Sequence, residues 1–380
     1  MFIYQKTNRY FAQISTGFES IAVKELEKLG AGQIQTGFRG IYFSADPSVL
    51  YSVNYKSRLI SHVLAPLVSF ECRDREDLYR EGKSIDWPSL FSVDNTFGII
   101  ANVSANENLR HSKFAALCLK DAVADLFRNR YGKRPDVDSS DPDVWINLHI
   151  RGKNATVSLD TSGGSLHRRG YRRETVDAPM QETLGAALIA LSGWNGQTPI
   201  YDPMCGSGTL LCEAMMTTCR IPAGFFRKKF GFFFMPDFQN KIWENIKQTE
   251  DNKIKQLLPG VISGSDIDRM AVRSAKANCK TIPGGNNIQI TQTNFKDISG
   301  LKNMMIVCNP PYGIRLKNED NLGKFYKEFG DFLKKQCKGS QAVIYFGNRE
   351  MIKHIGLKPS WKKPMRNAGL DGRVVKYELF

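Results

Sequence analysis

The spacing of hydrophobic and polar residues changes along the chain and predicts different architectures for its two halves. Near the N-terminus, apolar residues recur at helical spacing over 16–29, and strand-like segments lie on either side, at 9–14 and 40–43. Further on, 97–103 is strand-like and 113–130 is helical. In 144–150 apolar residues alternate with other residues, the period of a half-buried strand, and 155–159 is a further strand. These patterns predict one α+β unit over 1–56 and a second over 57–161.

The third unit begins after a change in composition. Residues 161–165, Thr-Ser-Gly-Gly-Ser, are expected to be flexible and polar, and a densely basic run follows at 167–173. From about residue 180, helices and strands alternate. The expected helices are 182–191, 268–280 and 321–335, and the expected strands are 198–201, 261–265, 304–308, 341–346 and 373–379. This alternation predicts an α/β fold with a parallel, doubly wound sheet over 162–380.

Composition and charge narrow the class of protein. Hydrophobic residues make up 42% and charged residues 24%, which is ordinary for a soluble globular protein. The formal net charge is +15, from 53 basic and 38 acidic residues, and suggests a polyanionic partner such as nucleic acid. The alternative is a basic protein that is merely soluble. The sequence has no signal-like start at 1–6 and no apolar run long enough to span a membrane, so we expect a cytoplasmic protein.

The eight cysteines argue against a metal site and against a disulfide framework. No Cys-x-x-Cys pair occurs and only five histidines are present, which disfavours zinc. A disulfide framework is unexpected in a chain of this length without a secretion signal. We expect reduced, mostly buried thiols.

A glycine turn at 202–208, Asp-Pro-Met-Cys-Gly-Ser-Gly, follows an expected strand and precedes a helix. Glycines allow a ligand to approach the backbone, and the start of the helix favours a carboxylate or phosphate. The alternative is a tight turn without a ligand, because a lone Gly-x-Gly is weak evidence.

Two acidic residues follow at the end of the next strand. Asp266 is placed to accept both hydroxyls of a ribose, while Asp268 could cap the helix that follows. The 64 residues from Asp202 to Asp266 far exceed the roughly 20 of a simple dinucleotide fold, owing to an insertion at 221–259 rich in Phe and Lys. This spacing counts against a plain NAD enzyme.

The most specific motif is Asn309-Pro310-Pro311-Tyr312, directly after an apolar strand. The prolines fix φ, which holds the Pro310 carbonyl in one direction, and the Asn309 amide oxygen is a second acceptor. Two convergent acceptors suit an amino group, and Tyr312 offers a face on which a base can stack. The alternative is an ordinary proline-rich turn.

A base amine is a poor nucleophile, because its lone pair is delocalised into the ring. Two acceptors would favour the pyramidal form that attacks a methyl group. Alignment of the amine with the methyl group and its sulfonium would supply much of the remaining lowering of the barrier. Cys308 could instead be a covalent nucleophile, as in carbon-5 pyrimidine methylation, but no Pro-Cys dipeptide occurs and a buried strand residue is the favoured interpretation.

The basic run could be a solvated linker, which is what a charge run usually means. Its position between an expected RNA module and a catalytic domain favours contacts with phosphates. The residues that we predict to contact RNA are Arg168, Arg169, Arg172, Arg173 and Lys113.

Several segments in one order resemble the THUMP-domain class I methyltransferases, and most closely the bacterial RlmL-type 23S rRNA guanine-N2 methyltransferases and their stand-alone relatives. The resemblance covers nearly the whole chain. Besides the three motifs above, it is carried by 134–138 (RPDVD), 159–163 (LDTSG), 166–172 (LHRRGYR), 178–184 (APMQETL) and 191–194 (LSGW).

The resemblance implies a ferredoxin-like unit, a THUMP RNA-binding domain and a Rossmann-fold methyltransferase that uses S-adenosylmethionine. It implies that Asn309 to Tyr312 grip the target base. The residues implied for the cofactor are Asp202, Met204, Cys205, Gly206, Ser207 and Gly208 at the methionine end, Asp266 at the ribose, Ile267, Asn294 and Phe295 at the adenine, and Pro179, Glu182 and Thr183 in a stretch that closes over it. The family often has Phe, Asp and Glu where Met204, Asn294 and Ile314 stand.

These observations predict a cytoplasmic RNA base amino methyltransferase with no metal that acts on guanine N2 in 23S rRNA. Alternatives are a tRNA guanine-N2 methyltransferase and a non-catalytic RNA-binding or ribosome-assembly factor. Adenine N6 in DNA and a protein glutamine amide also use Asn-Pro-Pro-Tyr sites, but the N-terminal RNA module argues against both. The intact Asp266 and Asn309 motifs argue against a non-catalytic factor.

Overall fold

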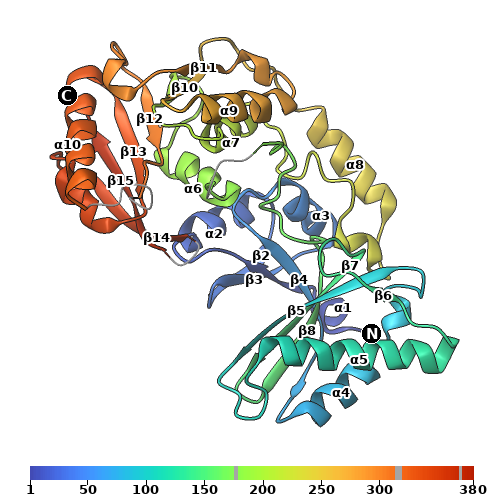
Figure 1. Cartoon of the computed structure of the whole chain (residues 1–380). Helices are drawn as coiled ribbons and strands as arrows, with labels where there is room; N and C mark the ends of the chain where they lie inside the picture. Colours follow the sequence, from blue (N-terminus) through green and yellow to red (C-terminus); the bar gives the residue numbers. More distant parts are fainter. Residues whose placement is uncertain (175–178, 313–318, 368–369) are drawn as a thin grey trace.

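The N-terminal strands form one continuous sheet. The computed structural model describes residues 1–174, 179–312, 319–367 and 370–380, and within them lies an eight-stranded sheet of order β2-β3-β1-β4-β8-β7-β5-β6 (Figure 1). Ala178 and Ile314, singled out above, lie outside the described residues. The strands are β1 (Arg9–Gln13), β2 (Gly32–Gly37), β3 (Gly40–Ser44), β4 (His62–Glu71), β5 (Thr96–Ser104), β6 (Asp136–Val137), β7 (Val144–Arg151) and β8 (Asn154–Asp160).

Helices cover one face of this sheet, because apolar residues alternate along its strands. In β1, Tyr10 and Ala12 are buried in the core, whereas Arg9, Phe11 and Gln13 point to the opposite face. The helices of this half are α1 (Ile3–Thr7), α2 (Glu19–Lys28), α3 (Pro47–Lys56), α4 (Arg75–Ser84) and α5 (Ser112–Tyr131).

The long strand β4 belongs to both N-terminal units. Its first residues pair with β1, and residues 64–71 pair with β8, so that one ladder continues into the next. The boundary that we predict at residue 56 therefore does not separate two sheets, because the strands on both sides of it belong to the same sheet.

The C-terminal half contains the predicted doubly wound sheet, with the order β11-β10-β9-β12-β13-β15-β14 in the described residues. Strands β9 (Ile200–Asp202), β10 (Ile262–Asp266), β11 (Gln289–Gln292), β12 (Met305–Cys308) and β13 (Gln341–Phe346) are parallel, and β15 (Leu370–Glu378) and β14 (Trp361–Asn367) add an antiparallel edge. Its helices are α6 (Glu182–Ser192), α7 (Thr209–Thr218), α8 (Asn240–Asp251), α9 (Arg269–Thr281) and α10 (Glu319–Gln336). The strand order reverses between β9 and β12, where such sheets bind ligands.

The insertion at 221–259 attaches the catalytic sheet to the N-terminal unit. It carries α8, which lies beside α3 (Figure 1). It also carries a cluster of aromatic rings. The Tyr51 ring stacks on Phe232 with centroids 4.5 Å apart, and the Tyr55 ring meets Trp243 edge-on at 5.2 Å. Such pairs add to the burial of large rings, so the insertion fixes the two halves against each other.

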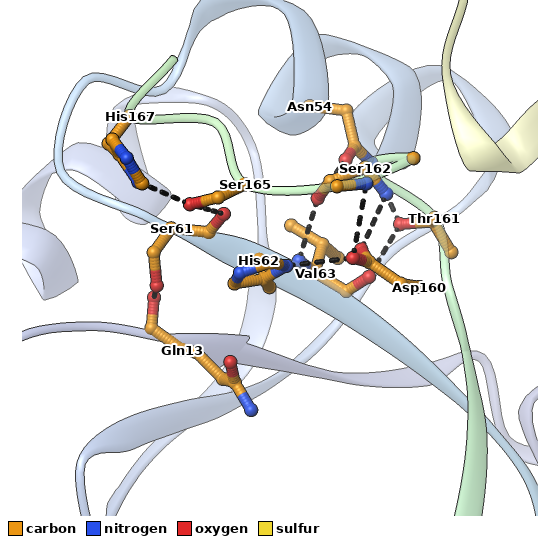
Figure 2. A network of polar contacts seen from close by, with 12 residues as sticks. Gln13, Asn54, Ser61, His62, Val63, Asp160, Thr161, Ser162, Ser165 and His167 are labelled. Atoms are coloured by element: carbon orange, nitrogen blue, oxygen red, sulfur yellow. Dashed lines mark hydrogen bonds and ion pairs between the residues drawn. The ribbon is translucent and has the colours of Figure 1, made fainter. Parts of the chain in front are cut away.

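The connection after β8 is held by hydrogen bonds, contrary to the flexible linker that we predict at 161–165. Thr161 and Ser162 are fully buried. The Ser162 hydroxyl donates to the Asn54 amide oxygen at 2.9 Å and accepts from the backbone N–H of Val63 at 2.8 Å (Figure 2). The Asn54 amide in turn donates to the Thr161 hydroxyl at 3.0 Å. The small polar residues that suggest flexibility are therefore those that fit this buried network.

Candidate active site

The glycine turn lies at the switch point of the C-terminal sheet, between the end of β9 and the start of α7. Gly206 has a φ of +52°, and a side chain there would point into open space, so its backbone is accessible to a ligand. Gly208 has a φ of +82°, and a Cβ atom there would lie 3.1 Å from the Cβ of Ala275. The first glycine therefore leaves room for a ligand, and the second allows α7 and α9 to pack closely.

Asp266 ends β10 and is tied to this turn. Its carboxylate accepts the backbone N–H of Gly206 at 2.9 Å and that of Asp268 at 3.0 Å. Asp268 is the helix cap, because its side chain accepts the N–H of Met270 at 2.8 Å at the start of α9. Asp268 therefore has the capping role, and Asp266 stays the residue predicted to bind the ribose.

The surroundings of Asp266 fit S-adenosylmethionine. A carboxylate at a strand end suits the ribose hydroxyls, and the neighbouring Ile267 is an apolar side chain that is 65% exposed, as a residue flanking an adenine ring would be. The open backbone at Gly206 suits the methionine end. Ser207, Cys205 and Met204 complete the turn, of which Cys205 and Ser207 are buried.

Asn294 and Phe295 follow β11, the strand that pairs with β10 on the side away from β9. The Asn294 amide oxygen accepts the N–H of Lys296 at 3.1 Å and thereby caps a short 3-10 turn. The Phe295 ring packs edge-on against Phe325 and Phe329 of α10, with centroids 5.6 and 5.5 Å away. The Phe295 side chain is thus part of the core, which leaves its backbone for any contact with adenine.

The Asn-Pro-Pro-Tyr segment follows β12, directly beside β9. Asn309 is half-buried, and its amide oxygen accepts a hydrogen bond from the Tyr312 hydroxyl. The Tyr312 ring lies against Gly347, where a Cβ atom would come within 2.5 Å of it, and meets the Tyr345 ring edge-on at 5.8 Å. An amide oxygen has two lone pairs, so Asn309 can still accept from a second donor.

Tyr326 of α10 supports this segment, and the sequence did not indicate it. Its hydroxyl donates to the Pro311 carbonyl at 3.2 Å. Because prolines have no N–H groups, such contacts at the carbonyls are the means by which neighbouring elements can orient the turn.

The acid at the end of β9 is buried beside the thiol of Cys308. Asp202 is only 1% exposed, and burial together with the nearby Asp266 raises the pKa of Asp202 to about 8. Burial and the same two acids also raise the pKa of the fully buried Cys308 well above its usual value. A raised pKa disfavours the thiolate, which is the reactive form, and supports the interpretation of Cys308 as a buried strand residue.

The prediction that all four arginines of the basic run contact RNA is wrong for Arg169. Its guanidinium is fully buried and donates to the carbonyls of Leu166 and Arg58 and to the Glu213 carboxylate, the last at 3.3 Å. A buried cation needs such partners, and it cannot reach a phosphate in solvent.

Arg172 is also bonded to the protein rather than free. Its guanidinium donates to the hydroxyls of Ser207 at 2.9 Å and Thr209 at 3.0 Å, and it pairs with Glu182 at 2.9 Å. Glu182 is one of the residues that we expect near the cofactor. Of the other two in that stretch, Thr183 is buried and Pro179 is exposed. Arg168, Arg173 and Lys113 are exposed, so their predicted contacts with RNA stay predictions.

Asn278 of α9 is a second link that the sequence did not indicate. It is fully buried, and its amide donates to the Ser207 carbonyl at 3.0 Å and to the Glu174 carbonyl at 2.8 Å. Its oxygen accepts the backbone N–H of Arg173 at 2.7 Å. The basic run and the glycine turn are thus joined by two side chains, Arg172 and Asn278.

Neither a metal site nor a membrane-spanning helix is found in the described residues. Those residues contain no group of three or more His, Cys, Asp or Glu side chains that could hold a metal ion. None of the described helices is both long and apolar enough to cross a membrane.

Comparison with known proteins matches three family models in order along the chain. The models are the RlmL ferredoxin-like domain at 9–64, the THUMP domain at 72–160 and the RMKL-like methyltransferase domain at 169–376. The chain is 41% identical to the Synechocystis protein named "Putative RNA methyltransferase slr0064" over 98% of this chain and 97% of that protein.

A second curated relative is longer than this chain. The "Ribosomal RNA large subunit methyltransferase K/L" of Syntrophotalea carbinolica is 34% identical over 98% of this chain, which spans about half (53%) of that protein. Among solved structures, "SMU.472, a putative methyltransferase complexed with SAH" superimposes with a TM-score of 0.85 at 25% identity, covering 98% of both chains.

Proposed function

The chain belongs to the family of S-adenosylmethionine-dependent RNA methyltransferases of the RlmKL type, and we propose that it methylates the exocyclic N2 of guanine in 23S rRNA. The observation that carries the proposal is the position of Asn309 to Tyr312 at the end of β12, next to the glycine turn and Asp266 across β9. We also propose three working parts, 1–56, 57–161 and 162–380, in which the first two present RNA to the third.

When bound, S-adenosylmethionine supplies an electrophilic methyl group. We propose that Asp266 holds the ribose, that Ile267 flanks the adenine with Asn294 and the Phe295 backbone at its edge, and that the turn from Asp202 to Gly208 holds the methionine end. Pro179, Glu182 and Thr183 would then border the same cleft, with Glu182 acting through Arg172.

At the other end of the site, the Asn309 amide oxygen and the Pro310 carbonyl accept the two N–H bonds of the base amine. With the cofactor bound, its methyl group would be the electrophile for the amine nitrogen, and these two acceptors would orient the amine until one of its protons is released to solvent. Since two acceptors draw on the amine protons, the lone pair becomes available without a strong general base.

Tyr312 contacts both the Asn309 acceptor and the ring of Tyr345. We propose that a base entering the pocket replaces the Tyr312 hydroxyl as one donor to Asn309 and stacks on the Tyr312 ring. A base inside a helix cannot reach this pocket, so the enzyme acts on a loop or flips the base out, at a cost of a few kcal/mol.

The test is methylation of purified RNA with labelled S-adenosylmethionine, followed by digestion to nucleosides and mass spectrometry. Large-subunit rRNA from cells that lack the enzyme should yield labelled N2-methylguanosine. A label confined to tRNA, or found in N6-methyladenosine, would contradict the substrate that we propose and leave the family assignment intact.

A further inference from the structure

Two aromatic rings lie side by side on the face of the N-terminal sheet that the helices leave uncovered. Phe11 of β1 and Tyr42 of β3 are directly opposite each other in the antiparallel pair, with ring centroids 4.7 Å apart. Their chain neighbours Tyr10 and Phe43 point into the core, whereas the Tyr42 side chain is 45% exposed. Phe11 is half-buried and lies over Gly40, so the exposed part of the pair is mainly the Tyr42 ring. An exposed ring contributes little to folding, which suggests that this ring has a partner outside the chain.

The place of these rings within the sheet indicates what that partner is. Four of the strands are connected as β1-α2-β2-β3-α3-β4 and lie in the order β2-β3-β1-β4, so that β1 and β3 are the central strands of these four. Four-stranded RNA-binding sheets carry their aromatic residues in the same way, where the rings stack on two or three unpaired bases. Stacking suits any base, because every base has a flat π face.

A cation stands beside the rings. The guanidinium carbon of Arg9 lies 6.0 Å from the centroid of the Tyr42 ring, and one of its nitrogens donates to Gln35 at 3.4 Å. The Arg9 Nε is buried and finds no acceptor within the described part of the chain. Stacking rings beside an arginine provide both contacts that single-stranded nucleic acid needs, one for the bases and one for the phosphates.

We propose that Phe11, Tyr42 and Arg9 form a binding platform for single-stranded RNA, separate from the methylation site. The two rings stack on successive bases, and Arg9 meets the phosphate between them. The platform is fixed relative to the catalytic sheet, because the backbone N–H of Arg366 in β14 donates to the Thr16 carbonyl at 3.2 Å, in the loop between β1 and α2. It can therefore hold one part of a substrate while another part enters the site.

The test measures binding of a short fluorescein-labelled oligouridylate to the full chain by fluorescence anisotropy. Tyr42→Ala should weaken binding by about fivefold or more, the smallest effect expected for one lost base stack. Tyr42→Phe should keep the wild-type affinity, because it keeps the ring. The control is Phe380→Ala, since Phe380 is 98% exposed and lies outside the two parts that we propose to present RNA.

The same RNA annealed into a duplex provides a second arm, because paired bases cannot lie on the rings. Tyr42→Ala should leave the affinity for duplex unchanged. Unchanged affinity for the single strand in a folded Tyr42→Ala protein would overturn the proposal and indicate a protein partner for this face. An equal loss in Phe380→Ala, or equal losses for both forms of RNA, would also overturn it. Should Tyr42→Ala not fold, Arg9→Ala must weaken binding and reduce its dependence on salt.

Discussion

Arg172 donates a hydrogen bond of 2.9 Å to Ser207, and this contact joins the basic run to the glycine turn at which we propose that the cofactor binds. The same guanidinium reaches Thr209, Glu182 and the Met180 carbonyl. A residue that resembles a phosphate contact in the sequence therefore connects the start of α6 to the glycine turn and the start of α7.

Replacing Arg172 should consequently affect the cofactor more than RNA. Arg172→Met should weaken S-adenosylmethionine binding by about tenfold, since hydrogen bonds to a charged group contribute roughly 1.5–3 kcal/mol. RNA affinity and its dependence on salt should stay close to wild type. Calorimetry with S-adenosylmethionine and fluorescence anisotropy with RNA, on the same preparation, measure the two affinities. If Arg172 instead binds RNA, the RNA affinity should fall and the cofactor affinity should stay unchanged.

Asp266→Ala should weaken S-adenosylmethionine binding by about 1.5–3 kcal/mol, the scale of hydrogen bonds lost to a charged group. Asp268→Ala is the matched control: it removes a helix cap, so it should lower stability by about 1 kcal/mol and leave the affinity unchanged. Calorimetry with both folded proteins is the measurement. Equal affinities in the wild type and Asp266→Ala would show that the ribose is held elsewhere.

The stability of the ligand-free protein should depend on pH through Asp202. Its pKa is about 8 in the folded chain, above the ordinary value of 3.8, so the folded state retains a proton that the unfolded state has lost. Stability therefore falls as the pH rises from about 4 to about 8 and changes no further through this group above that range. Asp202→Asn should flatten this part of the profile in thermal melts, and an unchanged slope would refute the assignment.

The arginines of the basic run should separate into two classes. Arg168→Ala with Arg173→Ala should weaken RNA binding and reduce its salt dependence, because both side chains are exposed. Arg169→Met should instead lower the melting temperature, since it leaves the buried Glu213 carboxylate unpaired. If the double variant of Arg168 and Arg173 binds RNA with the wild-type affinity, the basic run does not contact RNA.

The sequence predicted those elements whose periodicity is strong. The strand at 341–346 was predicted to the residue, and the helix at 113–130 within one residue at each end. Strands β2, β11 and β14 were not predicted, because their residues are largely polar or exposed and their pairing depends on partners distant in the chain. The parallel sheet followed from the alternation of strands and helices alone, whereas the strand order and its switch point were seen only in the structure.

The positions of Gly206, Asp266 and Asn309 at the ends of strands were predictable, because a local motif defines each of them, and their roles stay predictions. It was not predictable where burial decides a role. Arg168 and Arg169 are adjacent and chemically identical, yet only Arg169 meets Glu213, which is 44 residues away. Nothing in the spacing of Asn278 or Tyr326 distinguishes them from ordinary helix residues, since their partners are supplied by the fold.

The central claim is that Asn309 accepts the amine of a guanine in large-subunit rRNA. The most direct test is mass spectrometry of 23S rRNA nucleosides from a deletion strain complemented with the wild type, Asn309→Ala or Cys308→Ser. We predict that N2-methylguanosine is lost on deletion, is restored by the wild type and by Cys308→Ser, and is not restored by Asn309→Ala, whose single-turnover rate should fall at least about 100-fold. Full restoration by Asn309→Ala, or a loss of N6-methyladenosine instead, would contradict the account.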